Sequence, residues 1–289
     1  MLLEAGTRLP RPSSQTQHST RVLGVRLRIT ADQVDVWRAS LAALPDLQAV
    51  LSPDELDRAA RFHFEKDSRH FIAARGWLRT VLARYLDTSP ADLRFDYGVR
   101  GKPVLSAGCD LRFNLSHSHD IALLAVTKKR ELGIDVEFIK ESILGPEIAE
   151  CFFSTAEIAE LRALPREQQR AAFFAGWTRK ESYIKGTGAG LFGPLDRFTV
   201  SLAPNEPRVS LRVHDDECEA ARWTLCSLHL DEGYAGALAV EGSDWRLRYF
   251  DWSQLSAYMM PTVVLERLPL TPTVTESGRK ALRNHRLRV

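Results

Sequence analysis

Two carboxylates one residue apart mark the first stretch of this sequence that could do chemistry. Residues 132–139 read LGIDVEFI, and the two-residue period of a strand would place Asp135 and Glu137 on one face and the large apolar side chains on the other. Neighbouring carboxylates repel each other, so the pair predicts a nearby cation. Gly133 lies on the carboxylate face and would leave room for a ligand to approach the backbone.

A third carboxylate follows in residues 173–190, FFAGWTRKESYIKGTGAG. Helical spacing places Glu181 on the apolar stripe that includes Trp177 and Ile184. A carboxylate facing inward among aromatic residues is costly unless a positive group meets it. Lys185, one turn later, is one candidate for that group, and a metal ion is another.

The types of ligand atom that the three carboxylates offer favour a metal ion over Lys185 as the positive group. Asp135, Glu137 and Glu181 offer only oxygen ligands, and no cysteine or histidine pattern accompanies them. Such a set suits a hard cation such as Mg²⁺, which keeps water and accepts phosphate oxygens as its remaining ligands. The sequence therefore predicts a magnesium site that is open to phosphate.

Several polar residues elsewhere could contact a phosphorylated ligand. Lys102 lies between Gly101 and Pro103 in a defined turn, and is either a simple turn residue or a point charge presented to phosphate. His117 ends a predicted strand and, taken alone, is more typical of a hydrogen-bonded structural residue than of a ligand contact. Ser116 could contact phosphate or form the hydrogen bonds that fix its turn.

Arginines beside the apolar stripe of a predicted helix leave two interpretations open. Arg69, Arg75 and Arg79 could line an anion site together with Arg58 and His70. A solvated helix edge is the simpler interpretation.

Local signals predict the elements that position these residues. Residues 22–29 are expected to form a strand, and residues 31–44 a helix. Ser52-Pro53-Asp54-Glu55 is a capping box that begins a further helix, and Ser154-Thr155-Ala156-Glu157 is another, which predicts a helix to about Leu164. A longer amphipathic helix is expected from after Asp67 to about Leu86.

The glycine-rich stretch from Gly186 to Gly190 resembles a phosphate-binding loop, but it follows its helix instead of preceding one. We interpret it as a helix C-cap and turn. Short alternating strands are expected beyond it at 198–202, 209–213, 223–228 and 234–240, with an edge strand at 245–250.

Both halves of the chain therefore combine helices with a small antiparallel sheet, which predicts an α+β fold built from two similar halves. The expected units are a disordered tail at 1–21, an N-terminal half at 22–128, a C-terminal half at 129–254 and an extension at 255–289 that ends in a basic tail.

Composition narrows the function classes. Thirty-nine basic and 37 acidic residues leave a net charge of +2, which predicts neither nucleic-acid nor membrane binding. The four cysteines show no zinc or disulfide spacing and favour a reducing, cytoplasmic setting. No apolar run has the length of a membrane span, and the amino terminus lacks a secretory layout. The acid-free residues 5–21 weakly resemble a transit peptide but are more typical of a disordered tail.

Four motifs in a fixed order give the strongest indication of function. They are Gly101-Lys102-Pro103, residues 113–118 (FNLSHS), residues 133–137 (GIDVE) and residues 177–185 (WTRKESYIK). Together they resemble the 4'-phosphopantetheinyl transferases of the surfactin-synthetase-activating type, over about residues 22–250. The resemblance implies a pseudo-dimer of two α+β halves, with coenzyme A bound in the cleft between them.

The resemblance also implies roles for individual residues. Asp135, Glu137 and Glu181 would hold Mg²⁺ against the pyrophosphate of coenzyme A, with Lys185 near the same pyrophosphate. Lys102 and His117 would lie at the 3'-phosphate end of the nucleotide. Further candidates for contacts with coenzyme A are Ser116, Arg69 and Arg75. Family members often carry basic residues where this chain has Glu55, so contacts along that helix are not carried over.

The implied reaction is attack of a serine hydroxyl of an acyl or peptidyl carrier protein domain on the β-phosphorus of coenzyme A, with release of 3',5'-ADP. Either Glu181 or a water relay would take the serine proton. Such carrier domains are typically acidic around the serine, so a mixed apolar and basic rim is expected beside the cleft. We expect a monomer, because the two halves already form an internal dimer.

Two other functions share part of these features. A Mg²⁺-dependent phosphohydrolase or nuclease would use the acidic cluster to position water, and would hydrolyse coenzyme A without an acceptor. A non-catalytic module that binds coenzyme A or a carrier protein would bind coenzyme A independently of Mg²⁺. A pure binder has little need for a costly cluster of like charges.

Overall fold

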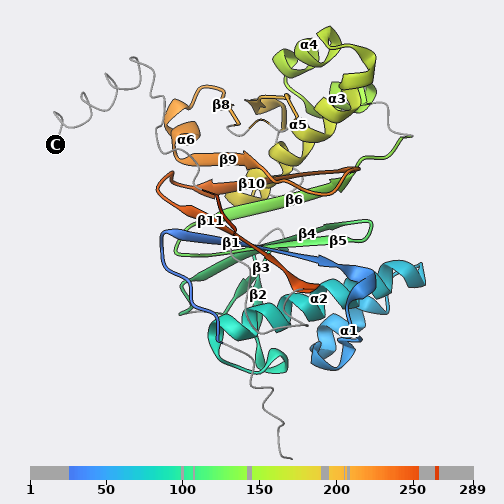
Figure 1. Ribbon diagram of the computed structural model, residues 1–289, viewed down its shortest axis with the longest axis vertical. Helices are drawn as coiled ribbons and strands as arrows, with labels where there is room; N and C mark the ends of the chain where they lie inside the picture. The colour runs from blue at the N-terminus through green and yellow to red at the C-terminus, as the bar shows by residue number, and fades with distance from the viewer. Residues whose placement is uncertain are drawn as a thin grey trace, which may run out of the picture.

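The computed structural model shows a mixed fold in which helices flank two layers of strands (Figure 1). It describes residues 26–98, 101–106, 108–141, 145–189, 195–204, 206, 209–253 and 264–266. The helices are α1 (Pro53–Ala59), α2 (Glu65–Leu86), α3 (Gly145–Phe152), α4 (Thr155–Ala163), α5 (Arg166–Thr187) and α6 (Glu217–Ala221). The strands are β1 (Gln33–Ser40), β2 (Phe95–Tyr97), β3 (Pro103–Leu105), β4 (Leu111–Ser118), β5 (Ile121–Lys128), β6 (Leu132–Phe138), β7 (Phe198–Val200), β8 (Leu211–Val213), β9 (Trp223–Ser227), β10 (Tyr234–Glu241), β11 (Arg246–Asp251) and β12 (Val264–Glu266). The 3₁₀ helices are η1 (Leu41–Ala43), η2 (Gln48–Val50), η3 (Pro90–Asp92) and η4 (Leu195–Arg197). The predicted α+β class is confirmed.

The larger sheet has the strand order β12-β11-β1-β5-β4 and carries α2 on its outer face (Figure 1). β1 pairs antiparallel with β5 and parallel with β11. Trp77 and Leu78 of α2 pack in one core with Trp37 of β1 and Leu124 of β5. All four side chains are fully buried, so hydrophobic burial holds α2 against this sheet.

The smaller sheet has the order β6-β10-β9, and α5 packs on its outer face. The inner faces of the two sheets share a core, in which Val34 and Leu123 of the larger sheet meet Ile134 and Leu238 of the smaller one. The layers therefore follow the order α2, larger sheet, smaller sheet, α5 (Figure 1). This arrangement agrees with two α+β halves packed sheet against sheet. It differs from the prediction in that β11, expected in the C-terminal half, lies in the larger sheet, where its pairing with β1 is parallel.

Side chains of β4 join the two sheets where their edges meet. β4 is the last strand of the larger sheet, and β6 is the first strand of the smaller one. Asn114, Ser116 and Ser118 of β4 accept hydrogen bonds from the backbone N–H groups of Ile134, Val136 and Phe138, respectively, over 2.8, 3.4 and 3.0 Å. These bonds satisfy the N–H groups at the open edge of β6 and fix its register beside β4.

Two predictions for the first 44 residues fail. The helix expected at 31–44 is β1 followed by η1, because alternate side chains enter different cores: Val36 lies between the sheets and Trp37 faces α2. No strand is present at 26–29, and residues 22–25 lie outside the described part, as do the expected tail at 1–21 and most of the extension at 255–289.

The predicted edge strand at 245–250 is β11, which lies between β1 and β12 inside the larger sheet.

The predictions based on local capping signals are confirmed. α1 begins after Ser52 with a capping box in which the Glu55 carboxylate accepts the Ser52 backbone N–H over 2.9 Å. α2 begins two residues before Asp67 and ends at the predicted position. α5 ends at Thr187, followed by Gly188 with a φ of 72°. None of the helices in the described ranges is long and apolar enough to cross a membrane.

Candidate active site

β6 and α5 bring the three predicted carboxylates into one region. The predicted division of β6 is confirmed: Ile134 and Val136 are buried between the sheets, and Asp135 and Glu137 occupy the alternate positions. Asp135 is 3% exposed and Glu181 is 4% exposed, whereas Glu137 is half-buried. Carboxylates with so little exposure need a compensating charge or a proton.

The negative charges of the three carboxylates repel one another in the folded protein. Burial, followed by the charge of Asp135, raises the pKa of Glu181 to about 7; Glu137 adds to this effect and Lys185 opposes it. Burial also raises the pKa of Asp135 and of Glu137. A cation between them would remove this repulsion.

Two of the carboxylate oxygens have no hydrogen-bond partner among the residues that the structure describes. Asp135 Oδ2 and Glu181 Oε1 are buried without a hydrogen bond. Oxygen-only donors with free lone pairs fit a hard cation such as Mg²⁺. Within the described ranges, however, no group of three or more His, Cys, Asp or Glu side chains is drawn together tightly enough to form a ready metal site. The side chains therefore fit the ion by chemistry, and would have to converge to hold it.

Lys185 pairs with Asp135 and not, among the described side chains, with Glu181. Lys185 Nζ lies 2.5 Å from Asp135 Oδ1 and 3.1 Å from Ser116 Oγ. Ser116 donates to the same Asp135 oxygen over 2.9 Å, and Ser118 donates to Glu137 over 2.8 Å. Ser116 thus joins β4, β6 and α5 at the carboxylates, a role that neither sequence interpretation included.

His117 lies close to the same region from the end of β4. Partial desolvation, followed by the charges of His70 on α2 and Lys185 on α5, lowers its pKa. The three basic groups come from β4, α2 and α5 and are close enough for their charges to interact. Such a convergence favours the binding of an anion.

The arginines of α2 are divided between surface and core. Arg69 is exposed and pairs with Glu65 over 3.2 Å. Arg75 and Arg79 are buried, and both bond to the carboxylate of Glu55. The interpretation of a solvated helix edge is therefore wrong for Arg75 and Arg79, because both side chains are buried. Glu55 neutralises part of their charge inside the fold.

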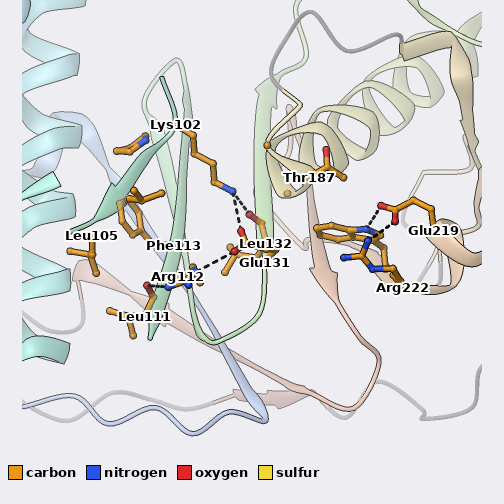
Figure 2. Close-up of a pocket in the computed structure, with 15 residues that line it drawn as sticks. Lys102, Leu105, Leu111, Arg112, Phe113, Glu131, Leu132, Thr187, Glu219 and Arg222 are labelled. Carbon is orange, nitrogen blue, oxygen red and sulfur yellow. Dashed lines mark hydrogen bonds and ion pairs between the residues drawn. The ribbon is translucent and has the colours of Figure 1, made fainter. Parts of the chain in front are cut away.

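Lys102 lies in a pocket of about 230 Å³ between the β2–β3 hairpin and the smaller sheet (Figure 2). Its Nζ donates to the carbonyl oxygen of Leu132 over 3.0 Å and to that of Lys185 over 2.7 Å. Arg222 lies across the pocket from Lys102 (Figure 2), and Trp223 also belongs to the pocket lining. Both hydrogen bonds of Lys102 thus go to backbone carbonyls of β6 and α5, with the Glu131 carboxylate 4.0 Å away.

Gly133 permits direct contact between β6 and α5. A Cβ atom at this position would overlap the carbonyl oxygen of Ser182 and the backbone nitrogen of Gly186. The predicted room for a ligand at Gly133 is therefore wrong, because α5 fills that space.

Replacing Gly133 by alanine is expected to lower the free energy of unfolding by about 1–3 kcal/mol, because backbone has to move to admit the methyl group. Chemical denaturation would measure the loss. Gly98→Ala is the matched control, since a Cβ there would lie 3.7 Å from the nearest atom, the Lys102 carbonyl oxygen. Equal stability of the two variants would contradict the close packing of β6 on α5.

One buried ion pair, formed by the residue that precedes Glu181 on α5, was not predicted from the sequence. Lys180 and Glu157 are both fully buried, 2.8 Å apart. Lys180 also donates to the carbonyl oxygens of Leu195 and Phe198. The capping box that predicted α4 contains Glu157, but no local signal pairs it with a residue 23 positions later.

Fold and site together define a two-half α+β protein with a buried acidic centre and basic groups at the junction of the halves, an arrangement suited to phosphoryl-group chemistry. A model of the 4'-phosphopantetheinyl transferase superfamily matches residues 131–239, and a model of the N-terminal part of 4'-phosphopantetheinyl transferases matches residues 35–129. The two matches divide the chain where the two halves meet.

Curated relatives agree with these matches. The chain is 39% identical over 243 residues to 4'-phosphopantetheinyl transferase HetI of Nostoc, which covers 82% of this chain and 99% of the relative. It is 31% identical over 195 residues to 4'-phosphopantetheinyl transferase Sfp of Bacillus subtilis, covering 68% and 84%. It is 28% identical over 264 residues to the mouse L-aminoadipate-semialdehyde dehydrogenase-phosphopantetheinyl transferase, covering 82% and 84%. The chain belongs to the 4'-phosphopantetheinyl transferase superfamily.

Proposed function

We propose that this protein transfers the 4'-phosphopantetheine group of coenzyme A to a serine of an acyl or peptidyl carrier protein domain. The serine oxygen forms a bond to the β-phosphorus, the bridging P–O bond of the pyrophosphate breaks, and 3',5'-ADP leaves. The observation that carries the proposal is the buried cluster of Asp135, Glu137 and Glu181, beside Lys185 at the junction of the halves. Family membership supplies the substrate class.

The three carboxylates would hold Mg²⁺, which neutralises the charge that grows on the leaving phosphate. The unpartnered oxygens of Asp135 and Glu181 support this assignment. Lys185 would lie on the other side of Asp135 and present a second positive charge to the pyrophosphate. Ser116 and Ser118 would orient the carboxylates through the hydrogen bonds that they already donate.

The serine proton needs an acceptor. Glu181, with a pKa of about 7 before any cation binds, has the basicity of a general base. If Glu181 holds the metal ion, its basicity would be lower, and a water that Glu181 orients would accept the proton instead. His117 and Arg75 would bind the nucleotide phosphates from the N-terminal half; Arg75 is buried and, besides its bond to Glu55, donates to the Tyr97 hydroxyl over 3.0 Å.

The carrier domain would dock next to Glu137. A pocket of about 180 Å³ lies there between β6, α3 and α5. It is lined by Glu137, Phe138, Lys140, Ile148, Phe173, Phe174 and Trp177. An apolar floor with Lys140 at its side suits a carrier helix that is apolar in the centre and acidic around the serine.

The direct test is the intact mass of an unmodified carrier domain after incubation with this protein, coenzyme A and Mg²⁺. The proposal predicts a gain of one phosphopantetheine, which EDTA prevents and added Mg²⁺ restores. A carrier domain whose serine is replaced by alanine serves as the control. No mass gain on several acyl and peptidyl carrier domains, with folded protein, would contradict the proposal.

The requirement for Mg²⁺ is expected to depend on pH. Because the pKa of Glu181 is about 7 without a bound cation, protons compete with the metal below that pH and no longer compete above it. The half-saturating Mg²⁺ concentration should therefore rise as the pH falls below about 7, by up to about tenfold per pH unit, and level off above. Initial rates over a Mg²⁺ series at each pH would measure it. A requirement that stays constant across this range would contradict the role of Glu181 as a ligand.

A further inference from the structure

Lys102 reaches from the N-terminal half to the two elements that carry the acidic centre. It follows the tight turn of the β2–β3 hairpin, where the Gly101 N–H donates to Gly98 over 2.8 Å. Its ammonium group binds two carbonyl oxygens, one on Leu132 at the start of β6 and one on Lys185 in the last turn of α5 (Figure 2). One side chain therefore connects three elements.

Lys102 binds where the backbones of β6 and α5 pack directly against each other. Gly133 and Gly186 permit this contact, and the Trp223 ring also packs against Gly186. The carbonyl group of Lys185 belongs to the last turn of α5, whose carbonyls lack helical partners and carry partial negative charge. A lysine ammonium satisfies this oxygen and favours the helix end electrostatically.

The donors of Lys102 are almost fully used by the protein. An ammonium group has three N–H donors. Two bind the carbonyl oxygens, and the Glu131 carboxylate lies 4.0 Å away on a third side. The side chain is 21% exposed, and its two hydrogen bonds both go to backbone of the elements that carry the acidic centre.

We propose that Lys102 is a positioning residue, which holds the end of α5 against the start of β6 and thereby sets the spacing of Lys185 and Asp135, and that it is not a ligand of the 3'-phosphate of coenzyme A. The proposal rests on the proposed function for its effect on transfer. Its structural part concerns only the contact between the hairpin, β6 and α5.

The test compares Lys102→Met with the wild type, using coenzyme A and 3'-dephospho-coenzyme A, which differ only in the phosphate concerned. A positioning role predicts that the variant weakens binding of both compounds by the same factor, so that their affinity ratio is unchanged. It also predicts a kcat lowered by about tenfold. A 3'-phosphate contact predicts instead that the ratio falls towards one, with kcat largely preserved.

Amide hydrogen exchange provides a readout that needs no activity. In Lys102→Met, peptides that cover residues 132–136 and 182–188 should exchange at least about tenfold faster, whereas peptides from α2 should be unchanged. Lys102→Arg keeps the charge and several donors, and should restore part of the protection. Lys129→Met removes an exposed lysine and should alter neither exchange nor transfer.

The outcomes separate the two hypotheses. Unchanged exchange in Lys102→Met, or an affinity ratio that falls towards one, would overturn the positioning role. A wild-type protein that binds no coenzyme A would contradict the proposed function, while the exchange measurement would still decide the role of Lys102. If Lys102→Met does not fold, Lys102→Gln, which also lacks the charge, takes its place in the affinity and exchange measurements, with the same two outcomes.

Discussion

Glu181→Gln is expected to reduce phosphopantetheine transfer by at least about 100-fold while the protein stays folded. The substitution keeps the shape of the side chain but removes the negative charge that a metal ligand or general base requires. The wild-type carboxylate is 4% exposed, and one of its oxygens has no hydrogen-bond partner among the described residues. Its negative charge therefore lowers the stability of the fold, which indicates a role in function. Intact-mass kinetics on a carrier domain would measure the loss.

The same variant should be more stable than the wild type at alkaline pH in the absence of divalent cations. The pKa of Glu181 in the folded protein is about 7, above its ordinary value of 4.5, so ionisation destabilises the fold. The penalty is fully present above pH 7 and disappears as the pH falls towards 4.5. Thermal unfolding at several pH values would show a gain for Glu181→Gln at high pH that vanishes at low pH.

Glu167→Gln is the matched control, because Glu167 is an exposed carboxylate in the first turn of the same helix. It should change neither transfer nor the pH dependence of unfolding. If Glu181→Gln retained transfer within a few-fold of the wild type, the central role of this carboxylate would be refuted.

The largest loss of stability is expected from breaking the buried pair of Glu157 and Lys180. Both side chains are completely buried, and removal of one partner leaves the other charge unpaired in the core. Glu157→Gln or Lys180→Met should each lower the free energy of unfolding by about 3–5 kcal/mol. The double variant should lose less than the sum of the single losses, because no charge is left unpaired.

Denaturation of the four proteins in this cycle would measure the coupling. The control is the surface pair of Arg162 and Glu150, in which both side chains are more than half exposed. Glu150→Gln should cost less than about 1 kcal/mol, since solvent screens such pairs. A loss at Glu157 as small as that at Glu150 would mean that the buried pair does not hold α5 to α4 and β7.

A structural feature could be predicted from the sequence where its signal lay within a few neighbouring residues. The capping boxes at Ser52 and Ser154 fixed α1 and α4, because the residues that form each box lie within one turn. The alternation around Asp135 fixed the carboxylate face of β6 for the same reason. These features need no knowledge of the rest of the fold.

β1 shows where local signals fail. Val34 and Trp37 of β1 fall at helical spacings with Leu41 and Leu44 beyond the strand, and these spacings favoured a helix at 31–44. The segment is a strand because β5 and β11 pair with it on both sides and both of its faces are buried. Such long-range pairing overrides local preference.

The acidic residues of the candidate site could be predicted from the sequence, but the contacts that hold the site together could not. The carboxylates and Lys185 stood out by type and spacing. The carbonyl partners of Lys102 and the pairing of Lys180 with Glu157 depend on contacts between distant elements, and backbone oxygens carry no sequence signal. Polar residues at every second position in β4, Asn114, Ser116 and Ser118, were a usable signal, since such alternation beside a buried strand indicates side chains that face a partner.

The amount of 3',5'-ADP released for each carrier domain modified tests the central claim most directly. Nucleotide release and carrier mass would be followed in the same reaction with coenzyme A and Mg²⁺, with and without the carrier domain. The account predicts one nucleotide per phosphopantetheine transferred, and no release when the carrier is absent or lacks its serine. Release of 3',5'-ADP without a carrier would identify a hydrolase, and binding of coenzyme A without release under any condition would identify a binding module; either result would contradict the account.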